Sequence, residues 1–355
     1  MDLLSANATD ILKKLVSFDS LSSQEKELVN WLEQAVRETG ALEIERHGDN
    51  LIFHLGSGEP WLLLNSHSDV VPPSPSHYGD PFAPVEKDGK IYGRGTTDAK
   101  GCGTGMLKAL LELSQEGFKP NGRASFALTV CEETCGAGNG MDFLRSIIKK
   151  PDAAIIGEPT TLAPCIAQKG LFILKVKTDG VSGHAARVQG KNALYEMAAV
   201  LEKLKTISFG TENSFIGKTK ITPTVINGGT VKNAYPEYCE LMVDIRTIPE
   251  VATDHILDKL KSELDAEIEV FSNRLVSTQT DPSEKIAQAA LKASGKDFFG
   301  SPTASDWVFL KDVPAVKIGP GHSQVSHTRD ECIEVEQLER GVGVYKEIIK
   351  NYFSS

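Results

Sequence analysis

Hydrophobic residues follow two different spacings in the first half of the chain. Consecutive apolar positions occur at LIFHL (51–55), WLLLNSH (61–67), SFALTVC (125–131) and AAIIGEP (153–159). Between the second and third of these runs, GCGTGMLKALLELSQEG (101–117) repeats its apolar residues at helical spacing. Uniformly apolar strands that alternate with helices are typical of a largely parallel sheet covered on both faces. The pattern therefore predicts an α/β domain.

The region before the first of these strands predicts helix. Apolar residues between positions 11 and 36 have helical spacing on both sides of a turn, DSLSSQE (19–25). Ser22 and Ser23, just ahead of Glu25, are typical of an N-cap followed by an acidic first turn.

The pattern changes after Gly170. The elements it then predicts, in order, are a half-exposed strand (171–180), a helix (192–207), two strands (219–228 and 237–249), a helix (251–264) and a strand (266–272). This β-α-β-β-α-β order is that of a ferredoxin-like unit, with four antiparallel strands and two helices on one face. From about residue 276 the pattern of helix, strand and terminal helix returns. We therefore predict one α/β domain made of residues 1–170 and 276–355, with residues 171–275 inserted as a second domain.

Length and charge narrow the class of protein. A chain of 355 residues is too long for one ordinary hydrophobic core, which agrees with two domains. Its formal charge of −10, from 38 Lys+Arg and 48 Asp+Glu, argues against a nucleic-acid or anionic-membrane partner. No segment approaches the roughly 18–20 apolar residues of a membrane span. The N-terminus also lacks the basic residues of a secretory signal, so we expect a cytoplasmic protein.

The six cysteines are scattered, which argues against a disulfide framework and favours a reducing compartment. Cys131 and Cys135 could be half of a zinc site. No second pair of Cys or His residues has matching spacing, so two small, partly buried residues are the favoured interpretation.

Acidic and imidazole side chains gather where the predicted strands end. The second apolar run ends at His67, with Asp69 just after it, and the third run is followed by Glu132 and Glu133. Glu158 lies at the end of the fourth run. Asp98 precedes the helix, and His327 follows AVKIGPG (315–321). Ligands of open α/β sheets bind outside the carboxyl ends of the strands, so these groups could converge.

Each of these residues has an ordinary explanation when taken alone. A single histidine is usually a hydrogen-bonded structural residue, and adjacent acids are common in loops. Several carboxylates brought together would repel one another and raise one another's pKa values, a cost that a cation removes. Imidazole and carboxylate ligands suit Zn²⁺, Co²⁺ and Mn²⁺. The coincidence of these groups therefore predicts a metal site.

The same residues lie in motifs that resemble a known family. These motifs are SHSDVVP (66–72), GRGTTDAKG (93–101), EET (132–134), GEPT (157–160), SGHAA (182–186) and SHTRDE (326–331). In this order, over nearly the whole chain, they are similar to the M20 metallopeptidases, the family of acetylornithine deacetylases, succinyl-diaminopimelate desuccinylases and carboxypeptidases. The inserted domain resembles the lid and dimerisation domain of that family.

The resemblance implies a site with two divalent metal ions, Zn²⁺ or alternatively Co²⁺. His67 and Glu158 would hold one ion, Glu133 and His327 would hold the other, and Asp98 would bridge both.

Two further residues would then support catalysis. Asp69 would accept the other N–H of the His67 imidazole and fix its tautomer. Glu132 would act as general base, taking a proton from water and later giving it to the leaving amine.

The resemblance also implies roles for residues outside the metal site. His184 would stabilise the oxyanion at the metals of a partner subunit, in a homodimer formed through the inserted domain, although a loop histidine is the simpler interpretation. Arg246 would bind the carboxylate of the substrate, for which a bidentate guanidinium is suited. Asn233 matches a substrate contact less closely. Gly321 could offer a backbone N–H to the ligand, although glycine–proline turns usually need no such reason.

The acetylornithine deacetylase branch of the family is the one most similar to five segments, which are GHAAR (183–187), GKNA (190–193), SDW (305–307), KIGPG (317–321) and SHTRDE (326–331). We therefore expect hydrolysis of the amide bond of a small N-acyl amino acid, N-acetylornithine or a relative such as N-succinylornithine, N-acetylcitrulline or N-acetyl-lysine, as in arginine biosynthesis. The usual tryptophan before a D-P-F segment is absent, with His77 and Tyr78 in that stretch, and His322 has no assigned role. These departures leave the substrate open.

Two alternatives remain. A succinyl-diaminopimelate desuccinylase or a di- or carboxypeptidase would use the same metals with other substrate contacts. A metal-binding protein without catalysis is disfavoured by Glu132, since a scaffold has no use for an unliganded carboxylate beside Glu133. The segment GRGTTDAKGCGTG (93–105) has neither of the common phosphate-binding glycine patterns, so a nucleotide site is not expected.

Overall fold

The computed structural model describes residues 1–354 except 77–78, 135–137 and 188–189. The chain divides into two compact units. The first contains Met1–Ile166, Thr280–Phe299 and Ser305–Ser355, and the second contains Ala167–Gln279 and Gly300–Ala304. The sequence predicted the changes of domain at residues 170 and 276. The roles expected for the second unit, as a lid and a dimerisation surface, stay predictions.

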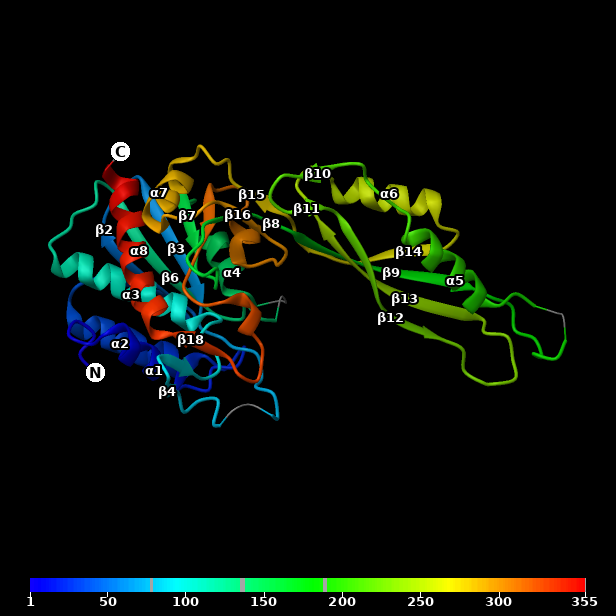
Figure 1. The fold of residues 1–355 in the computed structure, drawn as a ribbon, viewed down its shortest axis with the longest axis horizontal. Coiled ribbons are helices and arrows are strands. Elements are labelled where there is room, and N and C mark those ends of the chain that lie inside the picture. The colour runs from blue at the N-terminus through cyan, green and yellow to red at the C-terminus, as the bar shows by residue number, and fades with distance from the viewer. Residues whose placement is uncertain (77–78, 135–137, 188–189, 355) are drawn as a thin grey trace. The chain divides into compact units, whose positions relative to one another are not determined.

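The first unit is built on a mixed sheet (Figure 1). Its strands, in spatial order, are β1 (Glu43–His47), β2 (Asn50–Gly56), β6 (Arg123–Thr129), β3 (Trp61–His67), β7 (Ala153–Ile156), β17 (Ala315–Lys317) and β8 (Cys165–Gln168). The central strands β6, β3, β7 and β17 are parallel to one another, whereas β1, β2 and β8 pair antiparallel. Every residue of β3 is buried, which explains its uniformly apolar sequence.

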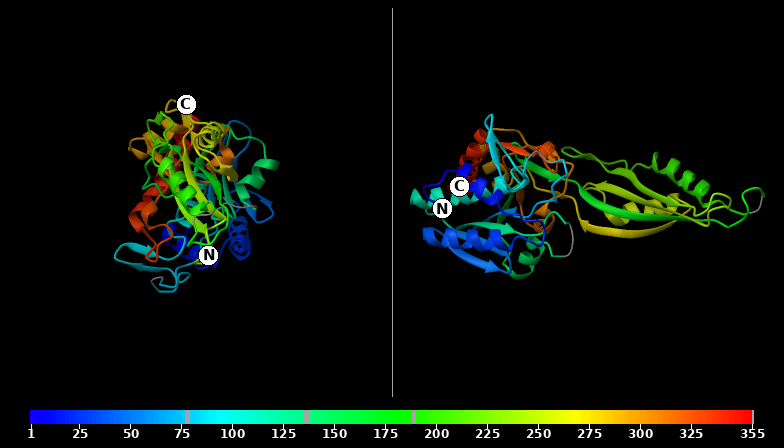
Figure 2. Two further views of the ribbon diagram at one scale, coloured as in Figure 1. Left: turned by 90° about the vertical axis from the view of Figure 1, so that its right-hand side faces the viewer. Right: turned by 90° about the horizontal axis from the view of Figure 1, so that it is seen from below.

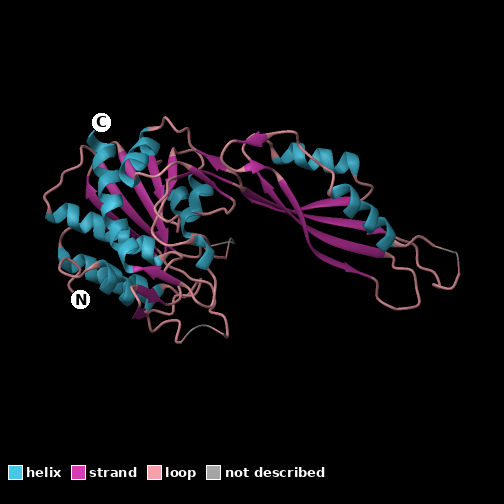
Figure 3. Ribbon diagram, in the orientation of Figure 1, coloured by secondary structure: helices cyan, strands magenta, loops and turns pink. Residues whose placement is uncertain are grey.

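Helices cover both faces of this sheet. On one face, α3 (Lys100–Gln115) packs with α8 (Val335–Ser354) and α1 (Ala8–Val16), and α7 (Lys285–Ser294) packs with α8. On the other face lie α4 (Gly140–Ile147) and the 3₁₀ helix η1 (Asp306–Leu310). Strand β6 shows the two faces clearly, because Ala127 packs with Met141 and Trp307 while Phe126 contacts α3 at Gly103. Figure 3 separates these helices from the strands by colour.

One more helix and a small sheet complete the first unit. Helix α2 (Lys26–Thr39) packs against β1 and β2. Strands β4 (Val85–Lys87), β5 (Lys90–Tyr92) and β18 (Cys332–Glu334) form a small antiparallel sheet in the order β18-β5-β4. Because β18 pairs with β5, the segment after His327 lies beside the segment before Asp98. His327 and Asp98 are both predicted site residues.

The second unit has a sheet and two helices in separate layers (Figures 1 and 2). The sheet is antiparallel with the order β12 (Lys220–Gly228), β13 (Tyr238–Thr247), β9 (Gly170–Asp179) and β14 (Glu267–Leu275). Helices α5 (Ala193–Leu204) and α6 (Thr253–Glu263) share a core with one face of the sheet. Alternate residues of β9 and β13 are buried, as a strand with one covered face requires. The predicted β-α-β-β-α-β order is confirmed.

The remaining strands are short. β10 (Glu212–Asn213) and β11 (Gly217–Lys218) form a hairpin in the second unit. β15 (Thr278–Gln279) and β16 (Phe299–Ser301) pair with β8. None of the helices in the described part of the chain has the combination of length and apolar character that crossing a membrane requires. A cytoplasmic location stays a prediction.

The predicted N-cap of α2 is wrong. The residue before the helix is Glu25, and its side chain makes no capping hydrogen bond. Ser22 instead donates to the Asp69 carboxylate at 2.7 Å, and the Ser23 hydroxyl lies 3.4 Å from the Cys131 sulfur. The fold places the turn against the segments that follow β3 and β6, so the hydroxyls find tertiary partners instead of the helix end. Of the CxxxC pair, Cys135 lies outside the described residues.

Candidate metal centre

His67 is the last residue of β3, and its imidazole is buried. Its Nδ1 lies 2.9 Å from the backbone carbonyl oxygen of Asp69, so Nδ1 carries the proton and donates it. The other ring nitrogen, Nε2, is buried and has no hydrogen-bond partner among the described residues. Carboxylate oxygens lie nearby, Asp98 Oδ1 at 3.3 Å and Glu158 Oε1 at 4.0 Å. A buried ring nitrogen without a hydrogen bond that faces two carboxylates fits a metal ligand, because a cation would satisfy all three groups.

Four more side chains complete two groups of candidate ligands. The first group is His67, Asp98 and Glu158, and the second is Asp98, Glu133 and His327, with the ligand atoms of each group within 4.8 Å of one another. His327 Nε2 is 3.1 Å from Glu133 Oε1 and 3.3 Å from Asp98 Oδ2. The structure therefore brings together all five residues that the sequence predicted as ligands, with Asp98 common to both groups.

The electrostatics of these groups reflect their crowding. Burial raises the pKa of Glu158 to about 8, and the negative charge of Asp98 adds to the effect. Burial also raises the pKa of Glu133, although its hydrogen bond with His327 acts in the opposite direction. Burial opposes ionisation of Asp98 as well, but the imidazoles of His327 and His67 outweigh it and hold the pKa of this carboxyl well below its usual range.

The imidazole of His327 responds to the same carboxylates. Its contacts with Asp98 and Glu133 raise its pKa to about 10. Without a cation, the negative charge of these carboxylates can be balanced only by protons, held on the carboxyl groups or on the imidazoles. Divalent ions would replace these protons and remove the mutual repulsion.

Asp69 differs from the prediction in how it contacts His67. The carbonyl oxygen of Asp69 accepts the imidazole N–H, while its carboxylate Oδ1 lies 3.5 Å away. The carboxylate accepts the backbone N–H groups of Glu132 at 3.0 Å and Glu133 at 3.1 Å, together with the Ser22 hydroxyl. These contacts form because the segment that follows β6 lies beside the segment that follows β3. The carboxylate thus orients the segment that carries Glu132 and Glu133.

Glu132 belongs to neither group of candidate ligands within the described residues. Burial raises the pKa of its carboxyl well above its ordinary value, and the nearby charges of Glu158 and Asp306 add to the effect. A carboxylate beside the ligands but outside them is free to exchange a proton.

Two more buried acids hold the segment after β6, and the sequence analysis gave neither this role. Glu25 accepts the backbone N–H of Cys131 at 2.9 Å, next to a left-handed φ of 56° at Cys131. Asp306 accepts the Thr129 hydroxyl at 3.2 Å and the Asn139 amide at 2.8 Å, and Asn139 in turn caps α4. Burial raises the pKa of Asp306 to about 6. The sequence signal was weak, because both acids are far from residues 129–139 along the chain.

Residues of the second unit were also predicted to act at the site. His184 is exposed, and its Nδ1 accepts the backbone N–H of Ala186 at 3.1 Å, which leaves the proton on Nε2. The carbonyl oxygen of Asn233 accepts the backbone N–H of Ala185. Arg246, on β13, forms a two-point ion pair with the carboxylate of Asp244 at 2.9 and 3.1 Å. The contacts of these side chains with a substrate stay predictions.

The structure gives no support for a backbone contact from Gly321 to substrate. Its N–H donates to the side chain of Gln337, and its φ of 95° explains why a glycine stands there. His322, for which the sequence suggested no role, caps the 3₁₀ turn η2 (Ser323–Val325) by accepting the N–H of Gln324. His77 and Tyr78 lie outside the described residues.

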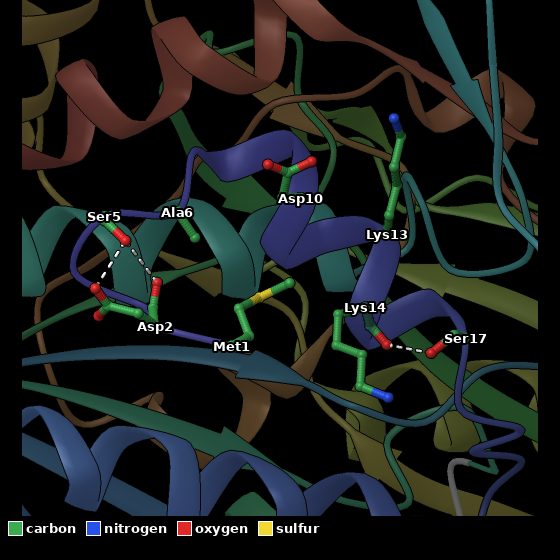
Figure 4. Close-up of a pocket in the computed structure, with 8 residues that line it drawn as sticks. All are labelled: Met1, Asp2, Ser5, Ala6, Asp10, Lys13, Lys14 and Ser17. Carbon is green, nitrogen blue, oxygen red and sulfur yellow. Dashed lines mark hydrogen bonds between the residues drawn. The ribbon is translucent and has the colours of Figure 1, made fainter.

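A surface hollow of about 600 Å³ lies along α1, lined by Met1, Asp2, Ser5, Ala6, Asp10, Lys13, Lys14 and Ser17 (Figure 4). Its polar side chains largely bond to neighbours, as Ser5 does to Asp2. It contains none of the candidate ligands.

Comparison with known proteins shows the family of the chain. Residues 63–351 match the description Peptidase family M20/M25/M40. The chain belongs to this family. The matched range includes every candidate ligand, and the resemblance drawn from the motifs is confirmed.

Curated relatives in the M20 family have two different names at similar identity. A succinyl-diaminopimelate desuccinylase of Wolbachia pipientis is 28% identical over 97% of this chain and 93% of the relative. An acetylornithine deacetylase of Aliivibrio fischeri is 27% identical over 96% of this chain and 97% of the relative. The chain is therefore a hydrolase of the M20 family, and these identities do not separate the two substrates.

Solved structures confirm the fold. A tripeptidase from Staphylococcus aureus superposes with a TM-score of 0.81 at 22% identity, over 98% of both chains. A Bacillus subtilis protein described as a dinuclear metal-binding peptidase of the M20 family superposes with a TM-score of 0.77 at 16% identity, also over 98% of both chains. The α/β fold with a separate antiparallel sheet is thus that of M20 peptidases.

Proposed function

We propose that this protein hydrolyses the amide bond of an N-acyl amino acid with the help of two divalent metal ions. The observation that carries the proposal is the buried His67 Nε2, which lacks a hydrogen-bond partner among the described residues and faces Asp98 and Glu158. The second group of ligands shares Asp98, which is the arrangement that two neighbouring ions need.

In this proposal His67, Asp98 and Glu158 would hold one ion, and Asp98, Glu133 and His327 would hold the other. Zn²⁺ suits these ligands, and Co²⁺ is an alternative. When bound, ions of this kind lower the pKa of water and polarise a carbonyl group.

Glu132 is the general base of the proposed reaction. Its carboxylate takes a proton from the attacking water, whose oxygen forms a bond to the carbonyl carbon. The same carboxyl group then gives the proton to the amide nitrogen as the carbon–nitrogen bond breaks. The products are the carboxylic acid and the free amine. The buried position of Glu132 supports this role, because a raised pKa makes the carboxyl an effective carrier of the proton.

We propose that the oxyanion is stabilised by His184 from the second subunit of a homodimer. The side chain of His184 presents an N–H at Nε2, as such a donor must. A free edge on the second unit supports the dimer. Strand β12 is the outer strand of its sheet and is largely exposed, with Val225 and Ile226 each 50% exposed. Edge strands with exposed apolar residues commonly pair with another chain.

For the substrate we propose N-acetylornithine or a relative such as N-succinylornithine, N-acetylcitrulline or N-acetyl-lysine, as in arginine biosynthesis. All of these carry a free α-carboxylate, which Arg246 would bind. The desuccinylase relative at 28% identity favours N-succinyl-diaminopimelate as a second candidate to the same degree. Asn233 is proposed to assist in binding either substrate.

The test is a comparison of kcat/KM across these acyl amino acids and a dipeptide, with metal-free protein reconstituted with Zn²⁺ or Co²⁺. We expect one acyl amino acid to exceed the others by at least about tenfold, which corresponds to roughly 1.4 kcal/mol in transition-state binding. If no member of the panel is hydrolysed by protein that has bound metal, the proposed function is wrong.

A further inference from the structure

Glu331 lies four residues after His327, and its side chain is completely buried. One of its carboxylate oxygens, Oε1, accepts three backbone N–H groups, from Gly95 at 3.0 Å, Thr97 at 3.1 Å and Asp98 at 3.1 Å. A single oxygen atom therefore holds the backbone from which the shared candidate ligand Asp98 extends.

The other carboxylate oxygen of Glu331, Oε2, accepts a hydrogen bond from Arg94, which lies in the same segment as Asp98. Arg94 donates from Nη1 to Oε2 at 2.5 Å and from Nη2 to the Thr328 carbonyl at 3.3 Å. The Thr97 hydroxyl donates to the Cys332 carbonyl at 2.6 Å, and Cys332 pairs with Tyr92 between β18 and β5. The segment before Asp98 and the segment after His327 are thus joined through Glu331.

Stability alone is a poor explanation for this arrangement. Burying Arg94 and Glu331 costs solvation free energy of both charges, and well-packed apolar residues in place of a buried ion pair are often as stable or more stable. The segment 93–98 runs between β5 and α3 without a strand partner, so its N–H groups need acceptors. Glu331 Oε1 accepts three of these N–H groups, and so fixes the backbone conformation of residues 93–98.

We propose that Glu331 is a positioning residue that sets the spacing between Asp98 and His327. The inference rests on the proposed metal centre, since it assumes that these two residues are ligands. The group of Asp98, Glu133 and His327 should depend on Glu331 most, because two of its three members lie on the segments that Glu331 joins. The group of His67, Asp98 and Glu158 should depend on it less, because only Asp98 is shared.

Two double variants isolate the acceptor from the charge pair. In R94M/E331Q the ion pair is removed, no unpaired charge is left, and the Gln carbonyl oxygen can still accept the three N–H groups. In R94M/E331M the ion pair is also removed without leaving a charge, but the acceptor is lost. The surface residue Glu334, on the same segment, provides the control E334Q. Metal-free forms of all proteins are titrated with Co²⁺ while the visible absorption of bound Co²⁺ is recorded, after circular dichroism has confirmed folding.

We expect wild type, E334Q and R94M/E331Q to bind two ions with similar affinities and spectra. For R94M/E331M we expect the weaker of the two binding steps to lose about 10–100-fold in affinity, the effect typical of groups that orient metal ligands. A folded R94M/E331M protein that binds two ions with wild-type affinities and spectra overturns the inference.

If R94M/E331M does not fold, E331D decides, because it keeps the charge pair and withdraws the oxygen by one methylene. Weaker binding of the second ion by folded E331D supports the inference, and unchanged binding overturns it. Wild-type protein that binds no Co²⁺ at all would instead contradict the proposed function.

Discussion

At the scale of single residues, similar groups have different roles according to what surrounds them. His67 and His54 are both buried histidines at strand positions. In both residues Nε2 is buried and has no hydrogen-bond partner among the described residues. His67 Nε2 faces the carboxylates of two other candidate ligands, Asp98 and Glu158, whereas His54 Nε2 faces only Glu45, at 3.4 Å, and His54 Nδ1 lies 2.7 Å from the Ser125 hydroxyl. Ser125, His54 and Glu45 are the residue types of a hydrolase triad, but no hydrogen bond joins His54 Nε2 to Glu45. Ser125 is also completely buried, so no substrate can reach it, and these three residues are structural.

The first prediction concerns the adjacent acids Glu132 and Glu133. We expect Glu132→Gln to keep its bound metal and lose about 10²–10⁴-fold in kcat, because the amide cannot carry a proton. Glu133→Gln should lose metal, because it removes a ligand charge. Metal analysis and kinetics on both variants provide matched controls. Activity that survives in Glu132→Gln would show that another group is the base.

The second prediction concerns stability and pH. Burial lowers the pKa of His54 below the ordinary 6.5, so the unfolded chain takes up a proton on this residue before the native protein does. The stabilising effect is therefore complete above pH 6.5 and is lost as the pH falls below it, by up to about 1.4 kcal/mol per pH unit. Urea unfolding of metal-free protein between about pH 7.5 and 5.5 should show a smaller fall for His54→Asn than for wild type. An equal fall in both proteins would contradict this assignment.

At the scale of elements, the ends of the parallel strands β3, β6 and β7 place His67, Glu133 and Glu158, and close packing brings those ends together. Asp98 and His327 come from the segments before α3 and after η2. The Ser66 hydroxyl lies 3.2 Å from the carbonyl oxygen of Ala99, which follows Asp98. It also lies 3.0 Å from the carbonyl oxygen of Gly157, which precedes Glu158. Gly157 is closely packed, because a Cβ atom there would lie 2.8 Å from the terminal methyl of Met106 and 3.1 Å from the Cβ atoms of Cys102 and Ser66. Buried carboxylates then hold the connecting segments, as Glu25 and Asp69 do for the segment after β6.

The third prediction tests one of these carboxylates. Glu25→Leu leaves the backbone N–H of Cys131 without its acceptor, which should destabilise the fold by about 1–3 kcal/mol. Glu25→Gln keeps an acceptor oxygen and should recover most of that loss. Urea unfolding of both variants measures the difference. Equal stability of the two variants would show that the hydrogen bond to Cys131 is unimportant.

At the scale of the whole molecule, two compact units contribute different parts of the proposed reaction. The candidate ligands and Glu132 all belong to the first unit, whereas His184, Asn233 and Arg246 belong to the second. The second unit adds an exposed edge strand, β12. A dimer that shares its active sites would account for both features.

The fourth prediction tests this sharing. Glu132→Gln and His184→Ala should each be nearly inactive alone. If His184 acts on the partner subunit, a mixed dimer has one site with an intact Glu132 and an intact His184. Random mixing after dissociation should then restore about a quarter of the wild-type activity, since half of the dimers are mixed and each has one complete site. Light scattering confirms the dimer, and a mixture that stays inactive despite exchange contradicts the sharing.

The sequence by itself determined the elements and the ligand types. Apolar runs of strand length and apolar residues at helical spacing depend on local pattern, so β3, α3 and the β-α-β-β-α-β unit could be predicted from them. His67, Asp98 and Glu158 could be predicted as candidate ligands because each lies at or near the end of such an element. Only the tertiary structure decided which acceptor each N–H finds. The roles of Glu25, Asp306 and Glu331 depend on contacts with backbone groups far away in the chain, and a hydrogen bond to backbone leaves no pattern in the sequence of its partner.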